Sequence, residues 1–131
     1  MIFVDTSAWY ARFAARDAGH DQAVAFLAAN RDSLYTTDYV LDESLTLFRA
    51  RGFDQWACYL GRLLLTGQLA TLVYISPEDV EAAWRLFDSH RDKQWSFTDC
   101  TSYVVMRRMG ITEAFAMDDH FRQFGFAIVR P

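Results

Sequence analysis

Short apolar runs that alternate with longer amphipathic segments constrain the fold of this chain more than any other feature. Residues 2–4 are Ile-Phe-Val, and residues 71–75 are Thr-Leu-Val-Tyr-Ile. Continuous apolar runs of this length are typical of strands buried on both faces, as parallel strands are. Strands that alternate with helices predict an α/β fold, a three-layer α/β/α sandwich in which helices cover a central, mostly parallel sheet.

The same patterns give approximate bounds for the expected elements. Ser76, Pro77 and Asp79 form a strong helix start, with a capping residue, a proline in the first turn and an acidic third residue. Thr6 or Ser7 is expected to cap the first helix. Strands are predicted at residues 2–4, 34–37, 71–75, 115–117 and 126–129, and helices at 6–17, 20–31, 39–51, 53–66, 77–89, 98–108 and 119–124.

Composition limits the classes of protein to which the chain can belong. With 131 residues, 52% of them hydrophobic, we expect one domain over residues 1–131 with a substantial core. The formal net charge of -4 argues against binding nucleic acid by bulk positive charge, but not against acting on it through a bound cation. Cys58 and Cys100 match no metal-ligand spacing and suit a reducing cytosol. We expect a cytoplasmic protein, since no signal peptide or membrane span is evident.

Four acidic residues stand where a fold of this kind can bring them together. Asp5 and Asp118 each follow a predicted strand, and the ends of parallel strands meet at one edge of the sheet. Asp99 lies at a predicted helix start, and Glu43 flanks the apolar arc of its helix. Three of the four also have an ordinary explanation, since Asp99 and Asp118 could cap helices. Glu43 could be a solvated residue beside an apolar face.

Together, the four carboxylates predict a site for a divalent cation. Two carboxylates about 4 Å apart repel each other by about 4 kcal/mol at an effective dielectric constant near 20, so some would take up protons unless a cation is bound. Mg²⁺ and Mn²⁺ prefer such oxygen ligands and can orient and acidify a water for attack on a phosphodiester. Asp5, Asp99 and Glu43 are expected to hold the main ion. Asp118 is expected to hold a second ion or to orient the attacking water.

Hydroxyl groups stand beside two of these carboxylates. Thr6 and Ser7 follow Asp5, and Ser96 and Thr98 precede Asp99. Within each pair we expect at least one hydroxyl to cap a helix, and the others to hold a carboxylate or a water next to the metal.

Other polar residues near the carboxylates are weaker candidates. Asp38, Asp42 and Asp119 are expected to be solvated neighbours, although Asp119 could assist the metal. The histidines lack the spacing of a zinc site. His120 lies near the carboxylates, but it is expected to be an ordinary polar residue in the first turn of a short helix.

Four segments of the chain carry a resemblance to a known family. They are residues 2–9 (IFVDTSAW), 36–43 (TTDYVLDE), 96–100 (SFTDC) and 115–121 (FAMDDHF), the last followed by a Gly-Phe pair at 125–126. In their order and spacing, the chain resembles the PIN-domain ribonucleases, and most closely the VapC toxins of bacterial toxin–antitoxin pairs. The resemblance spans nearly the whole chain.

The resemblance implies a metal-dependent endoribonuclease, the toxin of a type II toxin–antitoxin pair, with Mg²⁺ or Mn²⁺ in an acidic pocket. It also implies an RNA substrate, a cognate VapB-like antitoxin, and a homodimer that can form a hetero-oligomer with the antitoxin. The residues that align with the family's acidic positions are Asp5, Glu43, Asp99 and Asp118, and those that align with its hydroxyl positions are Thr6, Ser7 and Thr98.

Two other functions stay open at this point. One is a catalytically silent PIN-fold binding module that acts through protein partners, and the other is a structure-specific DNase. The intact acidic set argues against the first, and the lack of an added basic clamp argues against the second. The apolar stretch at residues 56–65 could serve dimer or antitoxin contact. RNA contact could come from six basic residues, which are Arg49, Arg51, Arg91, Lys93, Arg107 and Arg108.

Overall fold

The five strands of the computed structural model form a single sheet with the order β3-β2-β1-β4-β5. The structure describes residues 1–129, so the last two positions of the predicted domain lie outside the described part. The paired strands are parallel throughout this part, and β1 at the centre is buried at all three of its residues. The bounds are β1 (Ile2–Val4), β2 (Leu34–Thr37), β3 (Thr71–Val73), β4 (Glu113–Phe115) and β5 (Ala127–Ile128).

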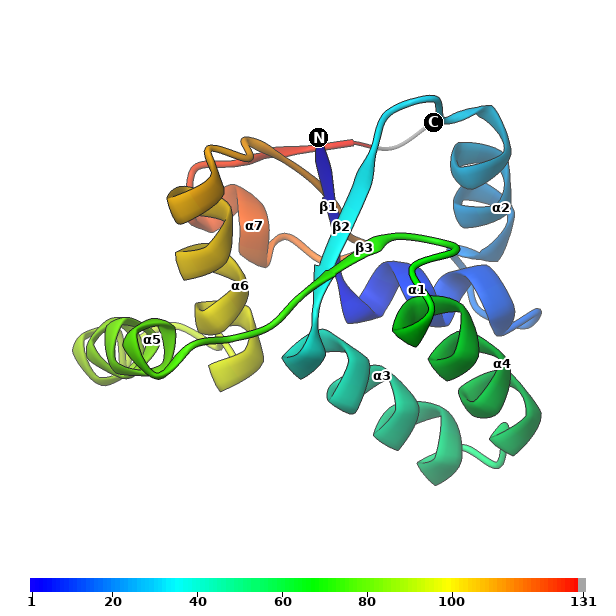
Figure 1. Cartoon of the computed structure of the whole chain (residues 1–131), viewed down its shortest axis with the longest axis horizontal. Coiled ribbons are helices and arrows are strands. Elements are labelled where there is room, and N and C mark those ends of the chain that lie inside the picture. Colours follow the sequence, from blue (N-terminus) through cyan, green and yellow to red (C-terminus); the bar gives the residue numbers. More distant parts are fainter. Residues whose placement is uncertain (130–131) are drawn as a thin grey trace.

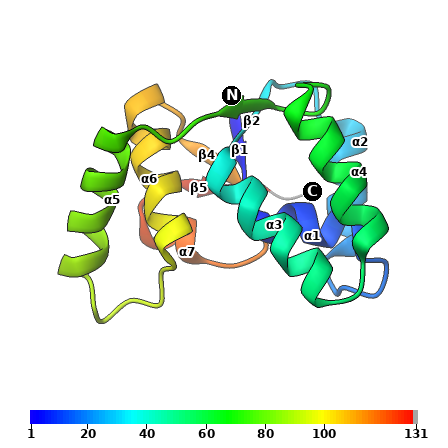
Figure 2. The same cartoon turned by 60° about the horizontal axis from the view of Figure 1, so that its bottom comes forward.

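Helices cover the sheet from two sides. Figures 1 and 2 show α5, α6 and α7 together on one side of the strands and α1, α2 and α4 on the other, which confirms the predicted α/β/α layering. Within residues 1–129, no helix has both the length and the apolar character that crossing a membrane requires. The bounds are α1 (Thr6–Phe13), α2 (His20–Ala29), α3 (Asp38–Ala50), α4 (Asp54–Leu65), α5 (Pro77–Ser89), α6 (Phe97–Met109) and α7 (His120–Gln123).

Several predicted bounds were wrong, and the ends of one helix and two strands have clear structural reasons. The first helix ends at Phe13 rather than at residue 17, because Ala14 already has an extended backbone. Strand β4 ends at Phe115, two residues earlier than predicted, because it pairs with β1 in a register that joins Val4 to Phe115. Strand β3 stops at Val73, where its pairing with β2 ends.

Helices α5 and α6 begin in the same way. In each, a serine hydroxyl accepts a hydrogen bond from the backbone N–H of an aspartate three residues later, and that aspartate accepts one from the backbone N–H of the serine. The pairs are Ser76 with Asp79, as the sequence predicted, and Ser96 with Asp99. Such a capping box satisfies two N–H groups that a helix start otherwise leaves unpaired. Helix α6 ends at Gly110, whose φ of 71° is a left-handed conformation that suits glycine.

Helices α5 and α6 share a small apolar cluster. Ala83, Trp95 and Cys100 are buried there, apart from the main core that lies against the sheet. An ion pair joins the same helices, because the guanidinium of Arg108 donates to both carboxylate oxygens of Asp79 at 3.1 and 2.8 Å. These contacts hold α6 against α5, through the apolar cluster near the start of α6 and the ion pair in its last turn.

Candidate active site

The four predicted carboxylates lie around one cavity, although they come from four parts of the chain. Asp5 follows β1, Glu43 is on α3, Asp99 is in the first turn of α6, and Asp118 lies between β4 and α7. The cavity has a volume of about 260 Å³. Its lining residues are Asp5, Thr6, Ser7, Glu43, Leu47, Gln94, Ser96, Asp99, Asp118 and His120.

Asp5 has one carboxylate oxygen that is held by the protein and one that is not. Oδ2 accepts hydrogen bonds from the hydroxyl and the backbone N–H of Ser7, at 2.8 and 3.3 Å. Oδ1 is buried and has no hydrogen-bond partner among the described residues, in a residue that is only 2% exposed. A buried oxygen without a donor is costly, so this atom is suited to a ligand that brings positive charge.

The cap of α1 differs from the prediction. Asp5 itself is the N-cap, so neither Thr6 nor Ser7 has that role. The Ser7 hydroxyl instead donates to Asp5 and accepts from the backbone N–H of Met117 at 2.9 Å. Ser7 therefore ties the end of β1 to the segment that carries Asp118.

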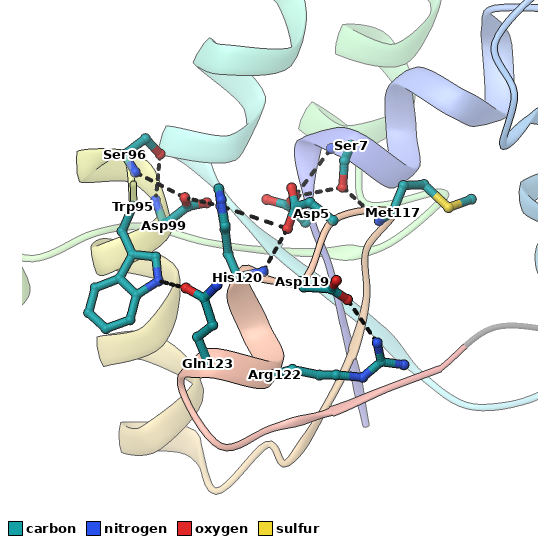
Figure 3. A network of polar contacts seen from close by, with 11 residues as sticks. Asp5, Ser7, Trp95, Ser96, Asp99, Met117, Asp119, His120, Arg122 and Gln123 are labelled. Carbon is teal, nitrogen blue, oxygen red and sulfur yellow. Dashed lines mark hydrogen bonds and ion pairs between the residues drawn. The ribbon is translucent and has the colours of Figure 1, made fainter. Parts of the chain in front are cut away.

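Asp99 takes part in the cap of α6, as the sequence allowed, and it also lines the cavity, whereas its role as a metal ligand stays a prediction. Its Oδ2 accepts from the backbone N–H of Ser96 at 3.0 Å, which completes the capping box. The same oxygen lies 2.7 Å from Nδ1 of His120 (Figure 3). The hydrogen bonds of this carboxylate with described residues thus fall on Oδ2, and Oδ1 remains for a ligand.

Glu43 is half-buried rather than fully solvated. Burial raises the pKa of Glu43, while hydrogen bonds from the hydroxyls of Thr6 and Thr98 lower it, and the net pKa is raised. Both threonines therefore lie near enough to the glutamate to influence its ionisation, and their role in holding this carboxylate stays a prediction.

Burial and crowding oppose the ionisation of this group of acids. Burial, followed by the charges of Asp99 and Asp118, raises the pKa of Asp5 from 3.8 to about 7. Burial is also the main reason that the pKa of Asp99 is raised, although hydrogen bonds from Ser96 and His120 oppose the shift. A bound cation would remove this penalty, because it favours the charged form of every carboxylate near it.

The donor set fits Mg²⁺ or Mn²⁺, since it offers carboxylate oxygens and one buried oxygen without a partner. Over residues 1–129, however, no three acidic, histidine or cysteine side chains form a ready-made cluster for an ion as they stand. An ion would have to draw the carboxylates inward.

Three neighbouring aspartates lie outside this cavity. Asp42 is exposed, as predicted. Asp119 is exposed too and accepts from Arg122 at 2.8 Å, away from the residues that line the cavity, so its role beside a metal stays a prediction. Asp38 was wrongly expected to be solvated, because it is partly buried and its Oδ1 accepts from the backbone N–H of Ile75 at 2.8 Å.

Sequence reasoning missed three residues that line the cavity, which are Leu47, Gln94 and His120. His120 was expected to be an ordinary polar residue, but it contacts Asp99 directly. Its position two residues after Asp118 was the available signal. No pattern in the sequence indicated Gln94, because it lies in an irregular segment between α5 and α6.

Several of the basic residues suggested for RNA contact are engaged in ion pairs. Arg49 pairs with Asp54, and Arg91 pairs with Asp88. Arg108 donates to the buried Asp79. These pairs reduce the positive charge available to a phosphate backbone.

Comparison with known proteins gives consistent results. Residues 2–127 match the PIN domain family. Two relatives, each named "23S rRNA-specific endonuclease VapC20", come from Mycobacterium tuberculosis strains CDC 1551 / Oshkosh and ATCC 25618 / H37Rv. Each is 36% identical over 131 residues, which cover 100% of this chain and 99% of the relative. The crystal structure of Mycobacterium tuberculosis VapC20, described as a Sarcin-Ricin loop cleaving toxin, superposes with a TM-score of 0.93 at 34% identity, over 100% of both chains.

Proposed function

This chain belongs to the PIN-domain family, and we propose that it is an endoribonuclease toxin that cleaves RNA with the help of Mg²⁺ or Mn²⁺ held in the acidic cavity. The observation that carries the proposal is the buried, unpartnered Oδ1 of Asp5 among three further carboxylates. The full-length similarity to proteins named 23S rRNA-specific endonucleases supports an RNA loop in 23S ribosomal RNA as the substrate. Such an enzyme would act in the cytoplasm, where ribosomes are.

Three side chains would hold the ion. Asp5 would offer Oδ1, Asp99 would offer the oxygen that neither Ser96 nor His120 occupies, and Glu43 would complete the set. When bound, the cation would neutralise charge on the phosphate and acidify water at the site. Asp118 would hold a second ion or orient the attacking water.

The other polar residues keep these carboxylates in place. Ser7 holds Oδ2 of Asp5 and links it to Met117, so the ligand oxygen stays directed at the cavity. Thr6 and Thr98 hold Glu43 from two different helices. Such preorganisation matters because only carboxylates that are already oriented stabilise the ion at low cost.

A cleavage assay with purified protein tests the proposal. We expect the parent to cut 23S ribosomal RNA at one position in the presence of Mn²⁺, to leave 16S ribosomal RNA intact, and to stop when a chelator is added. Asp5→Asn and Asp99→Asn should each abolish cleavage while the fold is retained, whereas the exposed Asp42→Asn should cut like the parent. Cleavage by purified Asp5→Asn at the parental rate, or by the parent in excess chelator, would refute the assignment.

A groove between α3 and α4 supports an antitoxin partner. Leu45, Ala57, Gly61 and Leu65 line it together with Arg49 and Arg62, and its volume is about 610 Å³. The side chain of Leu65 is 61% exposed, although Leu60 and Leu64 on the same helix are buried. We propose that an apolar helix of a VapB-like antitoxin occupies this groove. Leu65→Asp should then weaken complex formation in a pull-down with the co-expressed antitoxin, without loss of cleavage.

Exposed aromatic side chains on α5 support a homodimer. Trp84 is 54% exposed and Phe87 is 39% exposed, and their ring centroids lie 6.1 Å apart. We propose that a second copy of the chain covers this surface. Light scattering coupled to gel filtration should report a dimer for the parent and a monomer for Trp84→Glu, whereas a monomeric parent would contradict the proposal.

A further inference from the structure

His120 contacts two carboxylates of the cavity that come from different elements. Its ring Nδ1 lies 2.7 Å from Oδ2 of Asp99 on α6. Its backbone N–H donates to Oδ1 of Asp118, which precedes α7, at 3.1 Å. Figure 3 shows the ring between the start of α6 and the segment that leads into α7. One residue therefore links two of the four carboxylates.

The direction of the ring hydrogen bond follows from the other contacts of Asp99. Oδ2 already accepts from the backbone N–H of Ser96, so it acts as an acceptor. When Asp99 is ionised, as a metal ligand must be, the ring nitrogen that faces Oδ2 carries the hydrogen and donates. Two donors hold Oδ2, and this fixes the rotation of the carboxylate and directs Oδ1 away from them.

Contacts that do not involve the His120 ring keep α7 in place. Phe121 is fully buried in the main core. The side-chain oxygen of Gln123 accepts from the indole N–H of Trp95 at 2.8 Å. Removal of the His120 ring should therefore release Asp99 without detaching the helix.

We infer that His120 is a positioning residue that orients Asp99 and Asp118 toward the cavity, from which a divalent cation can draw them inward. The inference rests on the proposed function, because it concerns the ion proposed there. Side chains that hold metal ligands in place through hydrogen bonds typically change metal affinity or activity by about 10- to 100-fold when they are removed.

Calorimetric titration of RNA-free protein with Mn²⁺ tests the inference without any measurement of cleavage. His120→Ala should bind Mn²⁺ about tenfold more weakly than the parent or worse. His120→Asn should recover most of the affinity, because its amide nitrogen is bonded to Cγ, as Nδ1 is. His120→Gln should not recover it, because its nitrogen lies one bond further out. His90→Ala is the control, since the His90 ring nitrogen bonds to the backbone carbonyl of Leu86 in α5, which ends just before it, and this variant should bind like the parent.

Cleavage kinetics separate positioning from direct contact with RNA. At saturating Mn²⁺ we expect His120→Ala to lower kcat and leave KM for the RNA unchanged. If His120→Ala binds Mn²⁺ with the parental affinity, or if it raises KM without a change in Mn²⁺ affinity, the inference about His120 is overturned. Neither outcome would contradict the proposed function. If the alanine variant does not fold, equal Mn²⁺ affinities for the Asn and Gln variants would overturn it. A parent that binds no Mn²⁺ would instead overturn the proposed metal function and this inference with it.

Discussion

Replacement of Asp5 by Asn should stabilise the metal-free protein at neutral pH. The pKa of Asp5 is raised in the fold from 3.8 to about 7, chiefly by burial. Since a tenfold change in proton affinity corresponds to about 1.4 kcal/mol, ionisation of this group costs the fold up to about 4 kcal/mol. The folded-state pKa is above the unfolded one, so the stability is fully present below about pH 4 and is lost as the pH rises through about 7. An asparagine has no such cost, and its amide can donate to the neighbouring carboxylates.

Urea unfolding in the presence of a chelator, followed by tryptophan fluorescence, measures the effect. Between about pH 5 and about pH 8, the free energy of unfolding of Asp5→Asn should rise relative to the parent by about 2–3 kcal/mol. Asp42→Asn, an exposed change on α3, should follow the parent at both pH values. Added Mn²⁺ should stabilise the parent more than Asp5→Asn. If the parent and Asp5→Asn lose stability in parallel over this range, the buried carboxylate is not the source of the cost and the reasoning fails.

Three further predictions concern residues that cap helices α5 and α6 or join them to each other. Arg108→Ala should lower the free energy of unfolding by about 2 kcal/mol, because it leaves the buried Asp79 without its partner, whereas the exposed Arg107→Ala should change little in the same urea titration. Ser76→Ala and Ser96→Ala should each cost about 1 kcal/mol through loss of a cap, but only Ser96→Ala should also reduce RNA cleavage, because its partner Asp99 lines the cavity. Gly110→Ala should lower the free energy of unfolding by about 1 kcal/mol, because its φ of 71° is strained for alanine, and parental thermal stability would contradict this reading.

The layers of the fold could be predicted from sequence because local patterns encode them. The buried run at β1 and the start of α5 at Ser76 depend on neighbours in the chain, and the structure confirms both. The ends of elements could not be predicted as well. Strand β4 ends at Phe115 because of its register with β1, and that register depends on residues more than a hundred positions apart.

The site shows the same division between local and long-range information. Asp5, Asp99 and Asp118 could be predicted because each stands next to a strand end or a helix start, whereas Glu43 was predicted from its place beside the apolar face of its helix. The orientation of each carboxylate could not be predicted, because it depends on distant donors. Ser7 bonds to the backbone of Met117, and His120 bonds to Asp99 on another helix. These contacts form only when the folded elements come together.

The pairing of β1 with β4 has a consequence for synthesis of the protein. Asp5 leaves the ribosome early, but the strand that brings Asp118 beside it is made more than a hundred residues later. A growing polypeptide that has not yet reached residue 118 therefore lacks the complete set of carboxylates, and the cavity can be completed only near the end of synthesis.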